Sequence, residues 1–252
     1  MIRNIAAYRF VEIADPPTLA AAVRGWADAA GLRGTVLVAP EGINLFLAGT
    51  GAGIEDFLHQ LRGDARLAGI EVRDSWSGAV PFARLKVKLK REIISFRRDD
   101  ASPLRGRAPA VSPAALARWL AQGHDDGGRR VVMLDTRNRE ETAHGAFAGA
   151  LILPIDNFTD LPAALEPHRE ALADATVVGY CTGGIRCEKA ALWMRASGLD
   201  NALQLDGGIL GWFEANGGAA YDGRCFVFDE RVALDSSLRP LVDNDAAQAQ
   251  AA

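Results

Sequence analysis

The chain has 252 residues, of which 49% are hydrophobic and 24% are charged, so it can bury the cores of one large or two ordinary domains. Its net charge of −4 does not single out nucleic acid as a partner, and its three cysteines are too few for a disulfide framework or a four-ligand zinc site. No apolar run approaches the ~18–20 residues that span a bilayer, and no signal-type stretch follows the first residues, so we expect a cytoplasmic protein without membrane contact.

The first hundred residues alternate between strand-like and helix-like patterns. Strand, helix, hairpin, helix and strand are expected in turn over residues 4–13, 19–30, 35–48, 54–61 and 70–72. This β-α-β-β-α-β order is the ferredoxin-like pattern that acylphosphatases share. We therefore predict that residues 1–98 form an α+β domain.

A basic segment closes this predicted domain. Residues 84–98 hold seven basic side chains and one acidic one, for a net charge of +6. An alternating pattern places the first four cations on one face of a strand, with apolar residues on the other. Such a row is a candidate for RNA phosphate contact, although lysines also protect edge strands from aggregation. The predicted RNA-binding residues are Arg84, Lys86, Lys88, Lys90 and Arg91.

A second domain is expected after residues 99–112, whose prolines and glycine predict a linker. Residues 113–217 then alternate helical stripes with four short apolar strands, at 131–134, 151–153, 177–180 and 203–205. Uninterrupted apolar strands of this kind are typical of a parallel sheet covered on both faces. Residues 218–252 form a C-terminal extension and tail, of which 243–252 is rich in Ala and Gln and expected to be disordered.

The strongest chemical signal is a cysteine loop. Cys181 follows the predicted strand 177–180, and a helix is expected to begin near Arg186. Backbone N–H groups and a helix N-terminus favour an anion at such a turn. The cysteine is therefore expected to be a nucleophilic thiolate, assisted by the arginine. The loop itself consists of Thr182, Gly183, Gly184 and Ile185, and its glycines can adopt positive φ angles.

The length of the loop separates two chemistries. Cysteine phosphatases need five residues between cysteine and arginine to surround a phosphate, whereas four stand between Cys181 and Arg186. The loop is sized for a persulfide sulfur. A buried, inert cysteine is the structural alternative. Cys187 is either a core residue or a supporting or resolving thiol, and Cys225 is expected to be structural.

Two flanking stretches resemble the signatures of rhodanese domains. The first covers residues 135–150, and the second covers residues 205–212. Asp135 and Arg137 follow a central strand, where they either orient the loop by ion pairing or form a purely structural pair.

A longer motif narrows the resemblance. Residues 181–190, CTGGIRCEKA, resemble the tRNA wobble-uridine (uridine-34) 5-hydroxylase family. Three further stretches agree, at 34–44, 85–93 and 223–233, so that the similarity covers residues 5–235. The resemblance implies an oxygen-dependent reaction that forms 5-hydroxyuridine in the anticodon of tRNA. It further implies that Cys181 is the active cysteine and carries a persulfide. Longer members of that family have a cysteine-rich C-terminal extension that has no counterpart here.

Two other functions stay open at this point. One is a sulfurtransferase that passes persulfide sulfur between small molecules, and the other is a non-catalytic RNA-binding module. The intact loop disfavours the module, and the basic first domain together with the similarity over the whole chain disfavours the plain sulfurtransferase. No flavin, nicotinamide, iron or other metal motif is evident, so molecular oxygen as co-substrate is implied by the resemblance alone.

Overall fold

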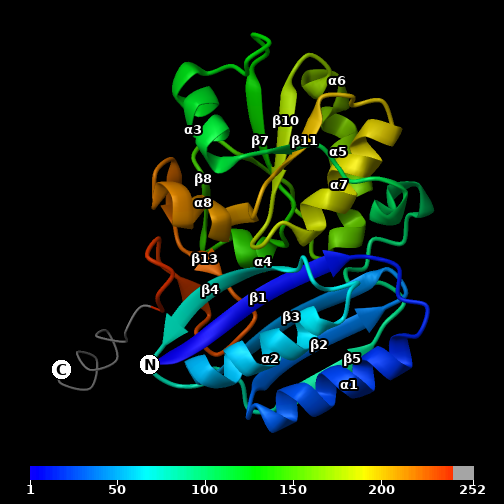
Figure 1. Cartoon of the computed structure of the whole chain (residues 1–252). Helices are drawn as coiled ribbons and strands as arrows, with labels where there is room; N and C mark the ends of the chain where they lie inside the picture. Colours follow the sequence, from blue (N-terminus) through cyan, green and yellow to red (C-terminus); the bar gives the residue numbers. More distant parts are fainter. Residues whose placement is uncertain (241–252) are drawn as a thin grey trace, which may run out of the picture.

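The computed structural model describes residues 1–240, and the tail expected to be disordered lies outside them (Figure 1). The first sheet has the strand order β4-β1-β3-β2-β5. Its strands are β1 (Ile2–Phe10), β2 (Arg33–Ala39), β3 (Gly42–Gly49), β4 (Glu71–Ser77) and β5 (Leu85–Leu89). The predicted β-α-β-β-α-β arrangement is confirmed, including the β2–β3 hairpin, and β5 adds a parallel edge strand beside β2.

Helices α1 (Pro16–Ala29) and α2 (Gly51–Gly63) cover one face of this sheet. Their apolar stripes meet alternate strand residues such as Val36 and Leu45, which are fully buried. Because side chains alternate along a strand, the residues between them lie on the opposite side. We call this side, which carries Tyr8, Leu37 and Asn44, the open face.

The second sheet has the order β6-β11-β10-β7-β9, and every neighbouring pair is parallel. Its strands are β6 (Ala110–Val111), β7 (Val131–Asp135), β9 (Leu151–Ile152), β10 (Thr176–Tyr180) and β11 (Ala202–Leu205). Val177 and Val178 belong to two different hydrophobic clusters, one on each side of the sheet. The prediction of a parallel sheet covered on both faces is confirmed.

Helices cover both faces of the second sheet. On one side pack α3 (Pro113–Gln122) and α8 (Gly208–Asn216), and on the other pack α5 (Leu161–Leu165), α6 (Arg169–Leu172) and α7 (Ile185–Ala196). The remaining short elements are α4 (Arg139–Thr142), β8 (Gly145–Phe147), β12 (Tyr221–Gly223), β13 (Cys225–Phe226) and β14 (Ala233–Leu234). Short 3-10 turns lie at Asp99–Ala101, Pro103–Arg105, Phe158–Asp160 and Glu166–His168. No helix within residues 1–240 is long and apolar enough to cross a membrane.

The segment 99–112, which we expected to be a linker, is instead packed into the second domain. Ala101 is fully buried, and the preceding Phe96 stacks on Phe158 with ring centroids 4.5 Å apart. Ala110–Val111 pairs with β11 as an edge strand. Long-range apolar contacts therefore override the local proline and glycine signal that predicted a linker.

The C-terminal extension also packs onto the second domain over its described part. Strand β12 pairs with β8, and Cys225, Val227 and Leu234 join the hydrophobic cluster of the second sheet. At the tip of this extension, Arg231 donates to the hydroxyl of Ser75 on β4, 2.8 Å away. The extension thus connects the two sheets.

Candidate active site

A cavity of about 580 Å³ lies between the open face of the first sheet and the carboxyl ends of strands in the second. Tyr8, Asn44 and Lys90 line it from the first domain, and Cys181 and Asp206 line it from the second. In parallel sheets, ligand sites lie at the carboxyl ends of strands. The first domain therefore supplies one wall of the site in which the reactive cysteine stands.

Cys181 occupies the turn between β10 and α7, as predicted. Its side chain is 1% exposed, and the Gly184 N–H donates to its Sγ at 3.2 Å. Gly184 has a φ of +98°, whereas Gly183 does not use a positive φ angle. The expectation that both glycines would need this freedom is therefore correct for Gly184 alone.

A second helix N-terminus also meets the loop. The N–H groups of Ile209 and Leu210 on α8 donate to the carbonyl oxygens of Cys181 and Thr182, at 2.9 and 3.0 Å. A Cβ atom on Gly208 would stand 2.4 Å from the Cys181 carbonyl oxygen. This close approach requires glycine and explains why glycines begin α8 in the stretch 205–212.

The surroundings of Cys181 favour its thiolate. Burial would raise the pKa of Cys181, but the neighbouring Cys187 thiol, the charge of Arg186 and the N–H groups of Arg186 and Gly184 outweigh it. The resulting pKa is lowered to about 6. The thiol of Cys187 moves the other way, because burial and the adjacent Cys181 sulfur raise its pKa. Of the two neighbouring sulfurs, Cys181 is therefore the one whose surroundings favour the thiolate, and Cys187 is the one that keeps its proton.

Arg186 adds its charge beside the sulfur and is itself held by an ion pair that the sequence did not predict. Its guanidinium forms a bidentate pair with Glu141 of α4, with N–O distances of 2.5 and 2.6 Å. Both side chains are almost fully buried. The pair fixes the loop to α4 and leaves the backbone N–H groups as the direct donors to the sulfur.

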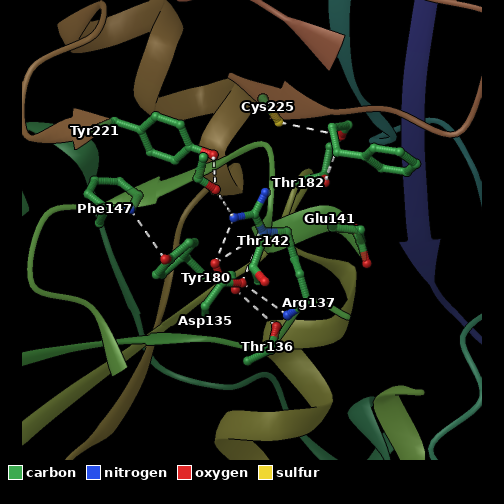
Figure 2. A network of polar contacts seen from close by, with 12 residues as sticks. Asp135, Thr136, Arg137, Glu141, Thr142, Phe147, Tyr180, Thr182, Tyr221 and Cys225 are labelled. Carbon is green, nitrogen blue, oxygen red and sulfur yellow. Dashed lines mark hydrogen bonds and ion pairs between the residues drawn. The ribbon is translucent and has the colours of Figure 1, made fainter. Parts of the chain in front are cut away.

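Asp135 and Arg137 pair with each other within the network of polar contacts that Figure 2 shows. Both side chains are fully buried, and Arg137 also donates to the carbonyl oxygen of Gly145 at 2.6 Å. The backbone N–H and the hydroxyl of Thr136 both donate to the carbonyl oxygen of Tyr180, each at 3.0 Å. This network holds the residue that precedes Cys181, while the ion pair itself does not contact the sulfur.

The three cysteines of the chain gather around one site. Cys187, in the first turn of α7, lies against the Thr136 hydroxyl at 3.6 Å. Cys225 lies on β13 near Thr182, and burial raises its pKa to about 12. No group of three or more His, Cys, Asp or Glu side chains within residues 1–240 is arranged to hold a metal ion.

Two residues of the 181–190 motif have a role that sequence reasoning missed. Lys189 is 3% exposed and reaches into the first domain, where its Nζ lies 2.8 Å from carboxylate oxygens of Glu41 and Glu92. Glu188 is fully buried and pairs with Arg107. Lys189 thus attaches α7 to the first domain, and Glu188 attaches α7 to the segment that follows the first domain.

The predicted basic row lies on the open face. In the parallel pairing of β5 with β2, Lys86 is opposite Thr35 and Lys88 is opposite Leu37. The row is exposed, and its members Arg84, Lys86, Lys88, Lys90 and Arg91 have no ion-pair partner within residues 1–240. Lys90 also lines the cavity. The row therefore runs along an edge of the sheet and ends at the Cys181 site.

A cysteine thiolate in a short strand–loop–helix turn, held by backbone N–H groups at the end of a parallel sheet, defines a rhodanese-like domain. The matching family model, the rhodanese-like domain, covers residues 116–215. A second model, the UPF0176 acylphosphatase-like domain, covers residues 2–93.

Similarity to known proteins extends over nearly the whole chain. A tRNA uridine(34) hydroxylase of Xanthomonas euvesicatoria pv. vesicatoria is 67% identical, over 97% of this chain and 99% of its own length. A relative with the same name from Xanthomonas campestris pv. campestris is 66% identical, over 98% of this chain and 97% of its own length. Another, from Xylella fastidiosa, is 60% identical, over 96% of this chain and 95% of its own length. The chain belongs to the tRNA uridine(34) hydroxylase family.

Proposed function

We propose that this protein hydroxylates the wobble uridine of tRNA at C5 in an oxygen-dependent reaction, with Cys181 as the reactive group. The names of its relatives support the substrate and the reaction. The observation that carries the proposal is the shared cavity of about 580 Å³, which is lined both by Cys181 and by the open face of the first domain. Sites for small molecules typically measure about 300–1,000 Å³, enough for a nucleoside.

The basic row would hold the tRNA backbone. Its exposed cations lie on the sheet face that lines the cavity, so that phosphates bound by Lys86 and Lys88 would lead toward Lys90 and the site. Each neutralised phosphate releases counterions, which gives affinity without sequence preference. Bases in a single-stranded anticodon loop can turn outward at little cost, so the wobble base can enter the cavity.

An aromatic side chain would help to hold the entering strand. Phe228 lines the cavity, yet it is 59% exposed, and its ring packs edge-to-face on Phe226 with centroids 5.0 Å apart. Stacking of a base on an exposed aromatic face typically contributes about 1–3 kcal/mol. Phe228 is the residue of the C-terminal extension that we expect to contact a neighbouring base.

Incubation of the full chain with a tRNA transcript tests this function. Nucleoside analysis by mass spectrometry should find 5-hydroxyuridine at position 34 when the reaction is run in air. The product should be absent under anaerobic conditions, and it should be absent with Cys181→Ser. Equal product without oxygen would refute the oxygen dependence. Equal product from the Ser variant would remove Cys181 from the reaction.

Sulfur transfer is a second candidate, favoured by the short loop and by the Gly184 N–H that points at the sulfur. In that case the Cys181 thiolate would attack the outer sulfur of thiosulfate, forming a persulfide and releasing sulfite, and cyanide would take that sulfur as thiocyanate and regenerate the thiolate. Thiocyanate formation by the full chain, lost in Cys181→Ser, would support this activity. Its absence together with tRNA hydroxylation would leave hydroxylation as the function.

A further inference from the structure

Tyr8 is presented to the cysteine loop by the other domain. It lies on β1, where its neighbour Ala7 faces the helices, so that the Tyr8 ring stands on the open face. The ring packs edge-to-face against Phe10, with centroids 5.8 Å apart. Tyr8 and Cys181 both line the cavity.

The hydroxyl of Tyr8 reaches the loop itself. A Cβ atom placed on Gly184 would stand 3.0 Å from this hydroxyl oxygen. The N–H of the same glycine donates to the Cys181 sulfur at 3.2 Å. The phenol and the thiolate are thus separated by a single residue of the loop, and Gly184 is needed both for its φ angle and for this approach.

The Tyr8 hydroxyl has no hydrogen-bond partner within residues 1–240, whereas the side-chain N–H groups of its polar neighbours on the open face are paired. The amide of Asn4 donates to Ser75 and Ser77, and the amide of Asn44 donates to the carbonyl oxygen of Ile93 at 3.3 Å. Burial raises the pKa of Tyr8, and the negative charges of Glu188 and Cys181 raise it further. The group is therefore a neutral phenol with a proton to donate to a ligand.

We propose that the Tyr8 hydroxyl donates a hydrogen bond to O4 of the target uracil while the Cys181 sulfur adds to C6 of the same ring, an inference that rests on the proposed function. C5 of uracil receives the new oxygen, and it becomes electron-rich when a nucleophile adds at C6. A thiolate is the nucleophile that the loop provides. A donor placed where negative charge develops is the usual way in which proteins stabilise such an adduct.

The addition of the sulfur to C6 needs no oxidant. The S–C6 bond forms as the C5=C6 π pair shifts toward the C4 carbonyl, and the resulting enolate oxygen is stabilised by the Tyr8 O–H. In the absence of oxygen, C5 takes a proton from water. Loss of the original C5 hydrogen and expulsion of the Cys181 thiolate then return uridine with its C5 hydrogen exchanged.

Hydrogen exchange at C5 isolates this step from hydroxylation. The probe is a tRNA transcript whose wobble uridine carries deuterium at C5, incubated anaerobically with the full chain. The wild type should release the deuterium, and Cys181→Ser should not. Tyr8→Phe keeps the ring and removes only the hydroxyl, and it should slow exchange about 100-fold, the usual cost of losing one such donor.

Two readouts show whether Tyr8→Phe acts on the chemistry or on the structure. The affinity for tRNA and the alkylation rate of Cys181 by iodoacetamide should both equal those of the wild type, so that the loss is in kcat. Exchange at the wild-type rate in Tyr8→Phe would overturn the role of Tyr8. A parallel loss of tRNA affinity and of Cys181 alkylation would equally overturn it in favour of a structural role.

A trapping experiment separates this proposal from the proposed function. Transcripts with 5-fluorouridine at the wobble position should form a covalent adduct with Cys181, detectable by mass spectrometry of the denatured protein. If an enzyme that hydroxylates uridine in air shows neither exchange nor adduct, the addition step is wrong while the function stands. If exchange, adduct and hydroxylation are all absent, the proposed function falls with it.

Discussion

The Cys181 loop and the basic row on β5 carry the two functional signals of this chain, and they are built in opposite ways. In the loop, Arg186 is buried and forms a bidentate ion pair with Glu141, and the Cys181 sulfur accepts a hydrogen bond from a backbone N–H. In the row, Lys86 and Lys88 are exposed and unpaired within residues 1–240. A reacting sulfur needs a fixed environment, whereas a polyanion that is bound and released needs cations not already neutralised by the protein.

The contrast predicts that charge removal is costly in the loop. Glu141→Gln leaves the Arg186 guanidinium buried without a counter-charge, which should lower the free energy of unfolding by about 3–5 kcal/mol. Urea unfolding measures the difference. The exposed neighbour Glu140 on α4 offers a matched control, and Glu140→Gln should change stability by less than about 0.5 kcal/mol. Equal effects of the two variants would show that the buried pair is not what holds the loop.

Loss of the ion pairs between the two domains should have an intermediate effect on the free energy of unfolding. Lys189→Met removes the cation between Glu41 and Glu92, whose side chains are 13% and 23% exposed. Because these acids are partly solvated, the loss should be roughly 2–3 kcal/mol, below that of a fully buried pair. Lys88→Met, at an exposed position, should leave urea unfolding unchanged. A stability of Lys189→Met equal to that of Lys88→Met would contradict the role of Lys189 as the attachment point.

A smaller effect is expected from Cys187, in the first turn of α7. Cys187→Ala removes a neighbouring thiol that contributes to the lowered pKa of Cys181. The midpoint of the pH profile for iodoacetamide alkylation of Cys181 should therefore move upward. Since the thiolate fraction is lost as the pH falls through this midpoint, alkylation at pH 7 should slow. Cys225→Ala is the control. An unchanged alkylation midpoint in Cys187→Ala would exclude an effect of Cys187 on the pKa of Cys181.

Substitution in the basic row should not affect the fold. Replacing Lys86 and Lys88 together by Gln should lower the slope of log affinity for tRNA against log salt by about 1.4–1.8, at roughly 0.7–0.9 per phosphate contact. Arg118→Gln with Arg139→Gln, on the surface of the second domain, is the control of equal charge. An unchanged slope together with increased aggregation would identify the row as protection of an edge strand.

Local patterns predicted both sheets and the position of Cys181, because hydrophobic periodicity and a strand–loop–helix turn are encoded in neighbouring residues. The partners of the loop could not be predicted in this way. Glu141 meets Arg186 across 45 positions in sequence, and Lys189 meets Glu41 across 148. The linker prediction failed for the same reason, since the burial of Phe96 against Phe158 outweighs nearby proline and glycine. Such contacts depend on the tertiary fold.

We propose that the exposed cations and the buried thiolate serve one substrate in one cavity. The most direct measurement is the rate of Cys181 alkylation by iodoacetamide, with and without saturating tRNA at low salt. Bound tRNA should slow alkylation at least about tenfold, and raising the salt concentration should restore the rate as phosphate contacts are lost. A tRNA shortened to remove its anticodon arm should give no protection. If intact tRNA binds and leaves the alkylation rate unchanged, the wobble base does not enter the Cys181 cavity and the account is contradicted.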